Sequence, residues 1–86
     1  MLIGDETMLN KEIETEITQM CKNFKLLREK KRISKKELSK TSGVNEHIII
    51  SFENGIITKH VNVTHLFKLC CFFKIEVHKI FSPLEL

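Results

Sequence analysis

Residues 33–55, ISKKELSKTSGVNEHIIISFENG, decide the fold that we predict for this chain. Ser34 can accept a hydrogen bond from a free backbone N–H, and Glu37 three residues later can complete a capping box. A short helix is therefore expected over residues 35–41. Gly43 can adopt the left-handed conformation that often follows a helix end, so this helix should stop there.

A second short helix is expected a few residues later. Asn45 is a candidate N-cap, and the helix should continue to Glu53 before Asn54–Gly55 ends it. The β-branched run Ile48–Ile50 could also form a strand, but no nearby segment alternates apolar and polar residues as a pairing partner would. Two short helices joined by a tight, glycine-containing turn indicate a helix-turn-helix motif.

Upstream of the motif, apolar residues recur every three or four positions, which is helical periodicity: Ile13, Ile17, Met20, Phe24 and Leu27. Glutamates near the start of this segment and cations near its end complement the helix dipole. The segment from residue 10 to about residue 31 should form one long helix or two consecutive helices, and the periodicity favours neither. Residues 1–9 are expected to be frayed.

Downstream, residues 56–61 read as a loop, and Asn62 can cap a fourth helix. The inward face of that helix should consist of Leu66, Leu69, Cys70 and Phe73. A short fifth helix is expected over residues 76–81, and Ser82–Pro83 should end the ordered structure. The fold class predicted from these elements is all-α, with five helices.

The charge is unevenly distributed along a chain of 86 residues, a length that suits one domain. Residues 1–20 hold five acidic residues and one lysine, whereas residues 21–86 hold 13 Lys/Arg and six Glu. We therefore expect an acidic, partly helical N-terminal extension over residues 1–19 and a basic domain over residues 20–86. A basic domain suits a polyanionic partner, although a well-solvated surface also explains such a charge.

Several classes of protein are not indicated by the sequence. No catalytic triad, phosphate-binding loop or Cys-x-x-Cys pair is visible, so we expect no enzyme, no catalytic residues, no metal and no cofactor. Cys21, Cys70 and Cys71 favour reduced thiols in a cytoplasmic protein. The most apolar window, residues 61–80, is broken by polar and charged residues, which argues against a membrane span: Asn62, His65, Lys68, Lys74, Glu76 and His78. The N-terminus does not resemble a signal peptide.

From Phe24 to Phe81 the chain resembles the phage lambda repressor/Cro-like (XRE-type) helix-turn-helix family. The spacing from Ser34 through Gly43 to Gly55 fits that family without a gap. Further matching residues are Leu27, Arg28, Ile33, Glu37, Leu38, Val44, Ile49, Glu53, Leu66, Lys68, Leu69, Phe73, Ile75 and Ile80. The resemblance implies a five-helix lambda repressor-like domain over residues 20–86 that binds double-stranded DNA and regulates transcription, most often as a repressor.

The resemblance also implies roles for individual residues. It implies an internal ion pair between Arg28 and Glu53, and it implies that a recognition helix at about residues 45–53 enters the major groove. The residues that would contact bases are Asn45, Glu46, His47 and Ser51. The residues that would contact phosphates are Ser34, Lys35, Lys36, Asn54 and Lys59. Lys40 is a further phosphate candidate, and for Lys40 and Lys59 a purely solubilising role is as good an interpretation.

Two partner hypotheses remain open at this point. The first is a homodimer, because one module buries too little DNA for useful specificity; its contact would use apolar residues near the C-terminus: Phe72, Val77, Phe81 and Leu84. The alternative is a protein-interaction module on the same fold, antirepressor-like or antitoxin-like. Glu46, Ile48 and Ile50, which depart from the family pattern, and the acidic N-terminal helix as a docking site for a protein partner motivate this alternative.

Overall fold

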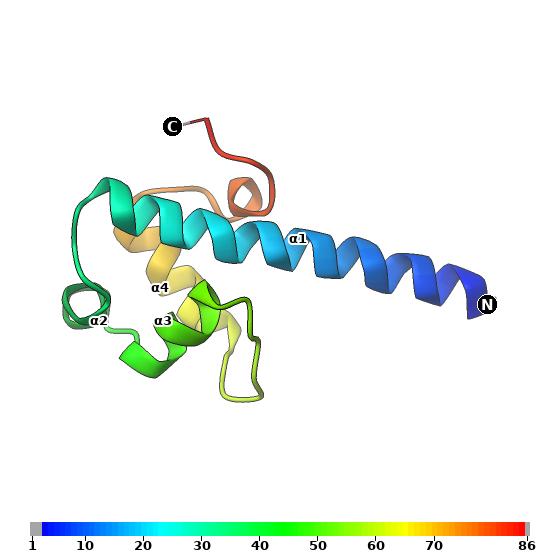
Figure 1. Ribbon diagram of the computed structural model, residues 1–86, viewed down its shortest axis with the longest axis horizontal. Helices are drawn as coiled ribbons and strands as arrows, with labels where there is room; N and C mark the ends of the chain where they lie inside the picture. The colour runs from blue at the N-terminus through cyan, green and yellow to red at the C-terminus, as the bar shows by residue number, and fades with distance from the viewer. Residues whose placement is uncertain (1–2, 86) are drawn as a thin grey trace.

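A computed structural model describes the backbone of residues 3–85 and the side chains of residues 11–85. Within that part of the chain the secondary structure is entirely helical (Figure 1). It comprises α1 (Ile3–Lys30), α2 (Lys35–Ser42), α3 (Glu46–Glu53), α4 (Val63–Phe73) and a 3-10 helix, η1 (Val77–Phe81). The all-α prediction is confirmed, but the count is four α-helices, because the fifth element is a 3-10 helix.

The first segment forms one long helix and not two consecutive ones, because α1 runs without interruption for 28 residues. Residues 3–9 are helical, so the prediction of a frayed start is wrong for them; residues 1 and 2 lie outside the described part. Once packing fixes the later turns, each further residue adds a hydrogen bond at little cost, which explains the extension. The first half of α1 projects beyond the rest of the molecule (Figure 1).

Local capping residues delimit α2, α3 and α4, as the sequence predicted. The Ser34 hydroxyl accepts from the backbone N–H of Glu37 at 3.0 Å, completing the start of the α2 capping box. Gly43 ends α2 at φ 77°, in the left-handed region. Asn45 caps α3 by accepting from the N–H of His47 at 2.8 Å, and Asn62 caps α4. Each cap satisfies a backbone group that a helix end leaves without a partner.

The core lies where α1 crosses α3, α4 and η1. Phe24 of α1 is at its centre: its ring centroid lies 5.6 Å from that of Phe52 and 6.4 Å from that of Phe73. The other buried apolar side chains are Met20, Cys21, Leu38, Val44, Ile48, Ile49, Leu69, Cys70 and Ile80. None of the described helices combines the length and the apolar character that crossing a membrane requires.

A buried asparagine ties α1 to the C-terminal segment. Asn23 has no exposed surface, and its Nδ2 donates to the carbonyls of Ile80 at 2.6 Å and Ser82 at 2.8 Å. Its Oδ1 accepts from Gln19 at 2.9 Å. These bonds satisfy a polar group whose burial would otherwise be costly. They hold η1 against α1, although η1 is too short to be stable alone.

Candidate nucleic-acid interface

Apolar contacts fix the angle between α2 and α3. Leu38 of α2, Val44 in the connecting turn and Ile49 of α3 are all buried. Gly43 makes the turn possible, because a positive φ strains residues that carry a Cβ atom. The two helices therefore present a fixed outer surface formed by their N-terminal ends.

An ion pair holds the end of α3 to α1. Arg28 donates to both carboxylate oxygens of Glu53, from Nε at 2.6 Å and from Nη2 at 2.9 Å. Its Nη1 donates to the carbonyl of Ile33 at 2.8 Å, in the chain that leads into α2. The Glu53 side chain is 3% exposed, and its hydrogen bonds raise the pKa of Arg28 above the ordinary value despite partial burial. The structure thus brings together the two residues that the resemblance paired.

The outer face of α3 carries the predicted base-contacting residues. Ile49 and Phe52 are buried against the core, whereas Asn45 and His47 are exposed and Glu46 and Ser51 are half-buried. Asn45, His47 and Ser51 line one shallow hollow on the surface. Glu46 lies in the same first turn of α3 but is not among the residues that line this hollow.

The rest of the lining comes from Ile48 of α3, from Thr58 and His60 of the loop and from His65 in the first turn of α4. Thr58, His60 and His65 were not predicted from the sequence as site residues. His65 Nδ1 accepts from the backbone N–H of Asn62 at 3.1 Å, which fixes the ring in the α4 capping box. The only signal for it in the sequence was its place three residues after the cap. Across the residues with described side chains, no group of three or more His, Cys, Asp or Glu has the arrangement of a metal site.

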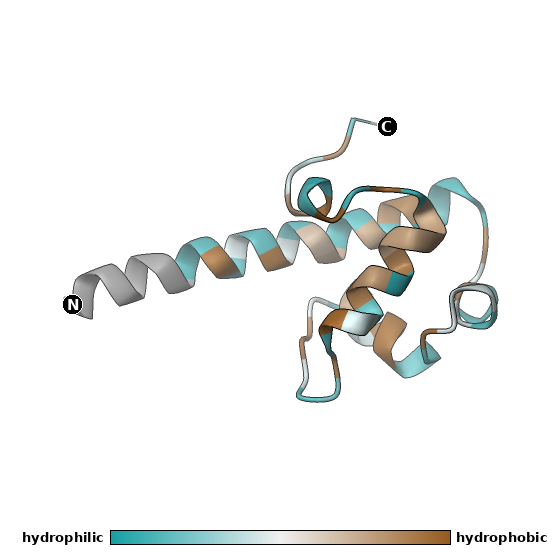
Figure 2. Ribbon diagram, turned by 180° about the vertical axis from the view of Figure 1, so that it is seen from behind, coloured by the Kyte–Doolittle hydropathy of each residue, from teal (hydrophilic) through white to brown (hydrophobic). Residues whose placement is uncertain are grey.

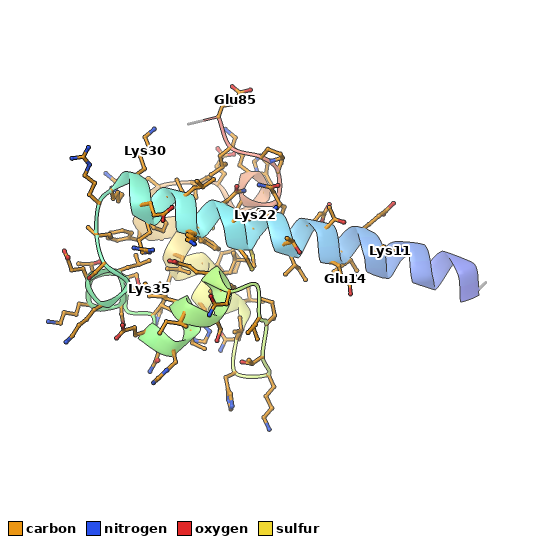
Figure 3. The ribbon with its side chains drawn as sticks, in the orientation of Figure 1. Lys11, Glu14, Lys22, Lys30, Lys35 and Glu85 are labelled. Carbon is orange, nitrogen blue, oxygen red and sulfur yellow. The ribbon has the colours of Figure 1, made fainter. Side chains whose placement is uncertain are left out.

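The predicted phosphate-contacting residues lie at the start of α2, directly after α3 and in the following loop. Lys36, Asn54 and Lys59 are exposed, and Lys35 is half-buried at the first turn of α2 (Figure 3). Ser34 is exposed, but its hydroxyl is already engaged in the capping box. Lys40 is also exposed, on the last turn of α2.

The two isoleucines of α3 that depart from the family pattern, Ile48 and Ile50, differ in how deeply they are buried. Ile48 is 8% exposed and belongs to the core, with one edge reaching the hollow, so it offers little free surface to a protein partner. Ile48 and the adjacent Ile49 are both buried because the core covers more of the circumference of α3 than one narrow line of residues. Ile50 is half-buried.

The C-terminal residues predicted for a self-contact offer little free surface. Phe72, Val77 and Phe81 are half-buried and pack against the core, and Leu84 is half-buried. Larger exposed fractions occur on α1, the 56–62 loop and α4: Ile13 at 45%, Leu26 at 46%, Ile56 at 54%, Ile57 at 43%, Val63 at 60% and Phe67 at 52%.

Comparison with known proteins identifies this region of the chain. A family model described as helix-turn-helix matches residues 24–80, which is well over half of the sequence. No curated protein and no solved structure matches the chain. The matched residues include the ion pair, both motif helices and the hollow on the outer face of α3.

Proposed function

Because the chain belongs to the Cro/XRE-type helix-turn-helix family, a DNA-binding family, we propose that it is a sequence-specific transcription regulator. In this proposal α3 enters the major groove of double-stranded DNA, and the protein acts as a repressor that binds as a homodimer. Repression needs only that the bound protein occupies its site.

The observation that carries the proposal is the outer face of α3. Its buried side packs on the core, its last residue, Glu53, is held by Arg28, and Asn45, His47 and Ser51 line the hollow on its other side. A rigid polar face on α3, together with the lysine-rich start of α2, can contact base edges and phosphates at the same time.

The chemistry of each base-contacting candidate follows from its free atoms. The Asn45 Oδ1 is held by the α3 cap, so its Nδ2 is the group that can donate to a base or phosphate acceptor. Serine can bond either type of base, and histidine can bond guanine N7 or O6. Glu46 can accept from cytosine N4, and without such a contact it would repel phosphate.

Phosphate contacts would supply most of the affinity. Lys35 and Lys36 open α2, while Asn54 and Lys59 lie after α3. The Ser34 hydroxyl already accepts a hydrogen bond in the α2 capping box, so only its proton and its second lone pair could contact DNA. Each lysine that neutralises a phosphate releases a counterion, so binding should weaken steeply as salt rises.

The proposal is tested by measuring the affinity for a duplex selected from random sequence, with Ser51→Ala and Lys35→Ala variants. Ser51→Ala should weaken binding to that duplex by about 1–3 kcal/mol and relax the preference at one base pair. Lys35→Ala should weaken binding to all sequences and reduce the salt slope by about 1. Lys22→Ala, which removes the same charge from an exposed position on α1, is the matched control and should change little.

The alternative, a helix-turn-helix-fold protein-interaction module, has lost one of its supports because Ile48 is buried. Its remaining supports are the half-buried Glu46 and Ile50 of α3 and the exposed acidic part of α1 as a docking site for a protein partner. This alternative would replace the proposal if Ser51→Ala and Lys35→Ala left DNA affinity untouched while Ile50→Asp abolished binding to a protein partner.

A further inference from the structure

Histidines from three different elements meet in the hollow on the outer face of α3. His47 comes from the first turn of α3, His60 from the loop that follows, and His65 from the first turn of α4. None of the lining residues carries a carboxylate; besides the histidines they are Asn45, Ile48, Ser51 and Thr58. In Figure 2 the first turn of α3 and the tip of the loop are both teal, which marks them as hydrophilic. The hollow is therefore a polar site with three imidazoles and no acidic group in its lining.

Few charged groups surround the hollow. Glu46 lies in the first turn of α3 and Lys59 lies in the loop, but neither lines the hollow. Lys68 lies further along α4, with its Nζ beside Gly43 in the turn between α2 and α3. No described residue of α1, α2 or η1 lines the hollow. Carboxylates and ammonium groups ordinarily titrate outside about pH 6–8, so a change of charge at this site within that range must come from the histidines.

A protonated imidazole binds DNA more strongly than a neutral one. A neutral ring has one N–H donor, whereas a protonated ring has two donors and a positive charge. The acceptors that DNA offers beside a recognition helix are phosphate oxygens and the N7 and O6 atoms of guanine. His47 and His60 are exposed, so their rings can reach such acceptors without disturbing the core. A nearby phosphate also raises the pKa of a histidine, because its negative charge favours the protonated form.

His65 differs from the other two because its ring caps α4. Its Nδ1 accepts from the backbone N–H of Asn62 at 3.1 Å, so a neutral ring carries its proton on Nε2. Protonation would turn Nδ1 from an acceptor into a second donor that faces this N–H. It would also place a positive charge at the N-terminus of α4, where the helix dipole disfavours cations. His65 should therefore stay neutral and donate to DNA from Nε2 alone.

We propose that DNA binding by this protein takes up protons at His47 and His60, so that the hollow holds a DNA strand more tightly as the pH falls. This inference rests on the proposed function and adds a regulatory property to the same site. His65 contributes a hydrogen bond that does not depend on pH in the same range.

The sign and the size of the effect follow from the linkage between proton binding and DNA binding. Because the phosphate raises the histidine pKa in the complex, the added affinity is fully present below the pKa of the free protein. It is lost as the pH rises through the higher pKa of the complex. A phosphate contact that raises the pKa by about one unit tightens binding by up to about tenfold per histidine.

The dissociation constant of the full chain for the selected duplex tests the proposal, measured by fluorescence anisotropy at about pH 8, 7 and 6 and at constant ionic strength. The wild type should bind about 10–100-fold more tightly at the lowest pH than at the highest. Glutamine keeps a hydrogen-bond donor but cannot gain a proton, so His47→Gln and His60→Gln should each remove about half of this gain on a logarithmic scale. The double variant should bind with nearly the same affinity at all three pH values.

Two further histidine variants serve as controls. His78→Gln is the matched control, because His78 is exposed on η1, and in both Figure 1 and Figure 2 η1 lies above α1 while α3 lies below it. This variant should keep the full pH dependence. His65→Gln retains an acceptor for the Asn62 N–H, so it should keep the pH dependence as well and change the affinity by the same factor at every pH.

The possible outcomes separate this inference from the proposed function. A wild-type affinity that stays constant between about pH 8 and 6, or a double variant that retains the wild-type pH dependence, would overturn the inference while DNA binding itself stands. Loss of the pH dependence in His65→Gln would overturn the assignment of the protons to His47 and His60. The absence of affinity for any duplex at all three pH values would refute the proposed function, and this inference with it.

Discussion

Replacing Arg28 by leucine should destabilise the fold by about 3–5 kcal/mol, because it leaves a buried carboxylate without its cation. The Glu53 side chain is 3% exposed and accepts two hydrogen bonds from Arg28. Water cannot replace these two lost hydrogen-bond donors unless α3 moves. The lost bond to the Ile33 carbonyl adds about 1 kcal/mol. Small domains have only about 5–15 kcal/mol of stability in total, so the variant should be partly unfolded at 37 °C.

The double variant Arg28→Leu/Glu53→Leu separates this account from a simple loss of contacts. Replacing both members of a buried pair by apolar residues is often close to neutral, so the double variant should be more stable than Arg28→Leu alone. Glu53→Leu alone should cost less than Arg28→Leu, because the Arg28 side chain is 13% exposed and can reach solvent.

Urea denaturation followed by circular dichroism gives the free energy of unfolding for all four proteins. The reasoning is refuted if Arg28→Leu costs less than about 1 kcal/mol, or if the two single effects simply add in the double variant. Because the folded pKa of Arg28 is raised by its hydrogen bonds to Glu53, the contribution of the Arg28 charge to stability is fully present below the ordinary pKa of arginine and is lost only as the pH rises above it.

Three further predictions concern Asn23, Gly43 and the two buried cysteines. Asn23→Leu should cost about 2–3 kcal/mol, because it leaves two carbonyls of the η1 segment unpaired, and hydrogen exchange should rise in that segment before it rises in α3. Gly43→Ala should cost about 1–2 kcal/mol in a thermal melt, because the residue is held at φ 77°; an unchanged melting temperature would argue against this turn. Burial raises the pKa of the Cys21 and Cys70 thiols, so a thiol reagent should label only the exposed Cys71 quickly. The free energy of unfolding should fall above about pH 9, because the thiols of the unfolded chain lose their protons at lower pH than those of the folded chain. A Cys21→Ala/Cys70→Ala variant whose stability falls equally steeply above about pH 9 would contradict this cause.

Helix boundaries set by local chemistry could be predicted from the sequence. Ser34, Gly43, Asn45 and Asn62 each act through atoms within four residues along the chain, so the spacing of residue types was sufficient. The start of α1 was misjudged because fraying depends on how firmly the later turns are packed, which the first residues do not reveal.

Contacts between distant segments could not be predicted from spacing. Asn23 meets a carbonyl 57 residues further along the chain, and nothing near it in the sequence marks it as more than one polar residue in an amphipathic helix. The Arg28–Glu53 pair was expected only through the family resemblance. The polar residues of α3 were likewise expected through the resemblance, whereas Thr58 and His60 join the site through the path of a loop.

The central claim is that the N-terminal half of α3 binds DNA, and an NMR titration of the labelled protein with the selected duplex tests it most directly. The account predicts that backbone amide signals of residues 34–36 and 45–51 shift or broaden first, and that the signals shift less as salt is raised. Undisturbed signals in α3 on addition of the duplex, with changes confined to the acidic part of α1 or absent, would contradict the claim.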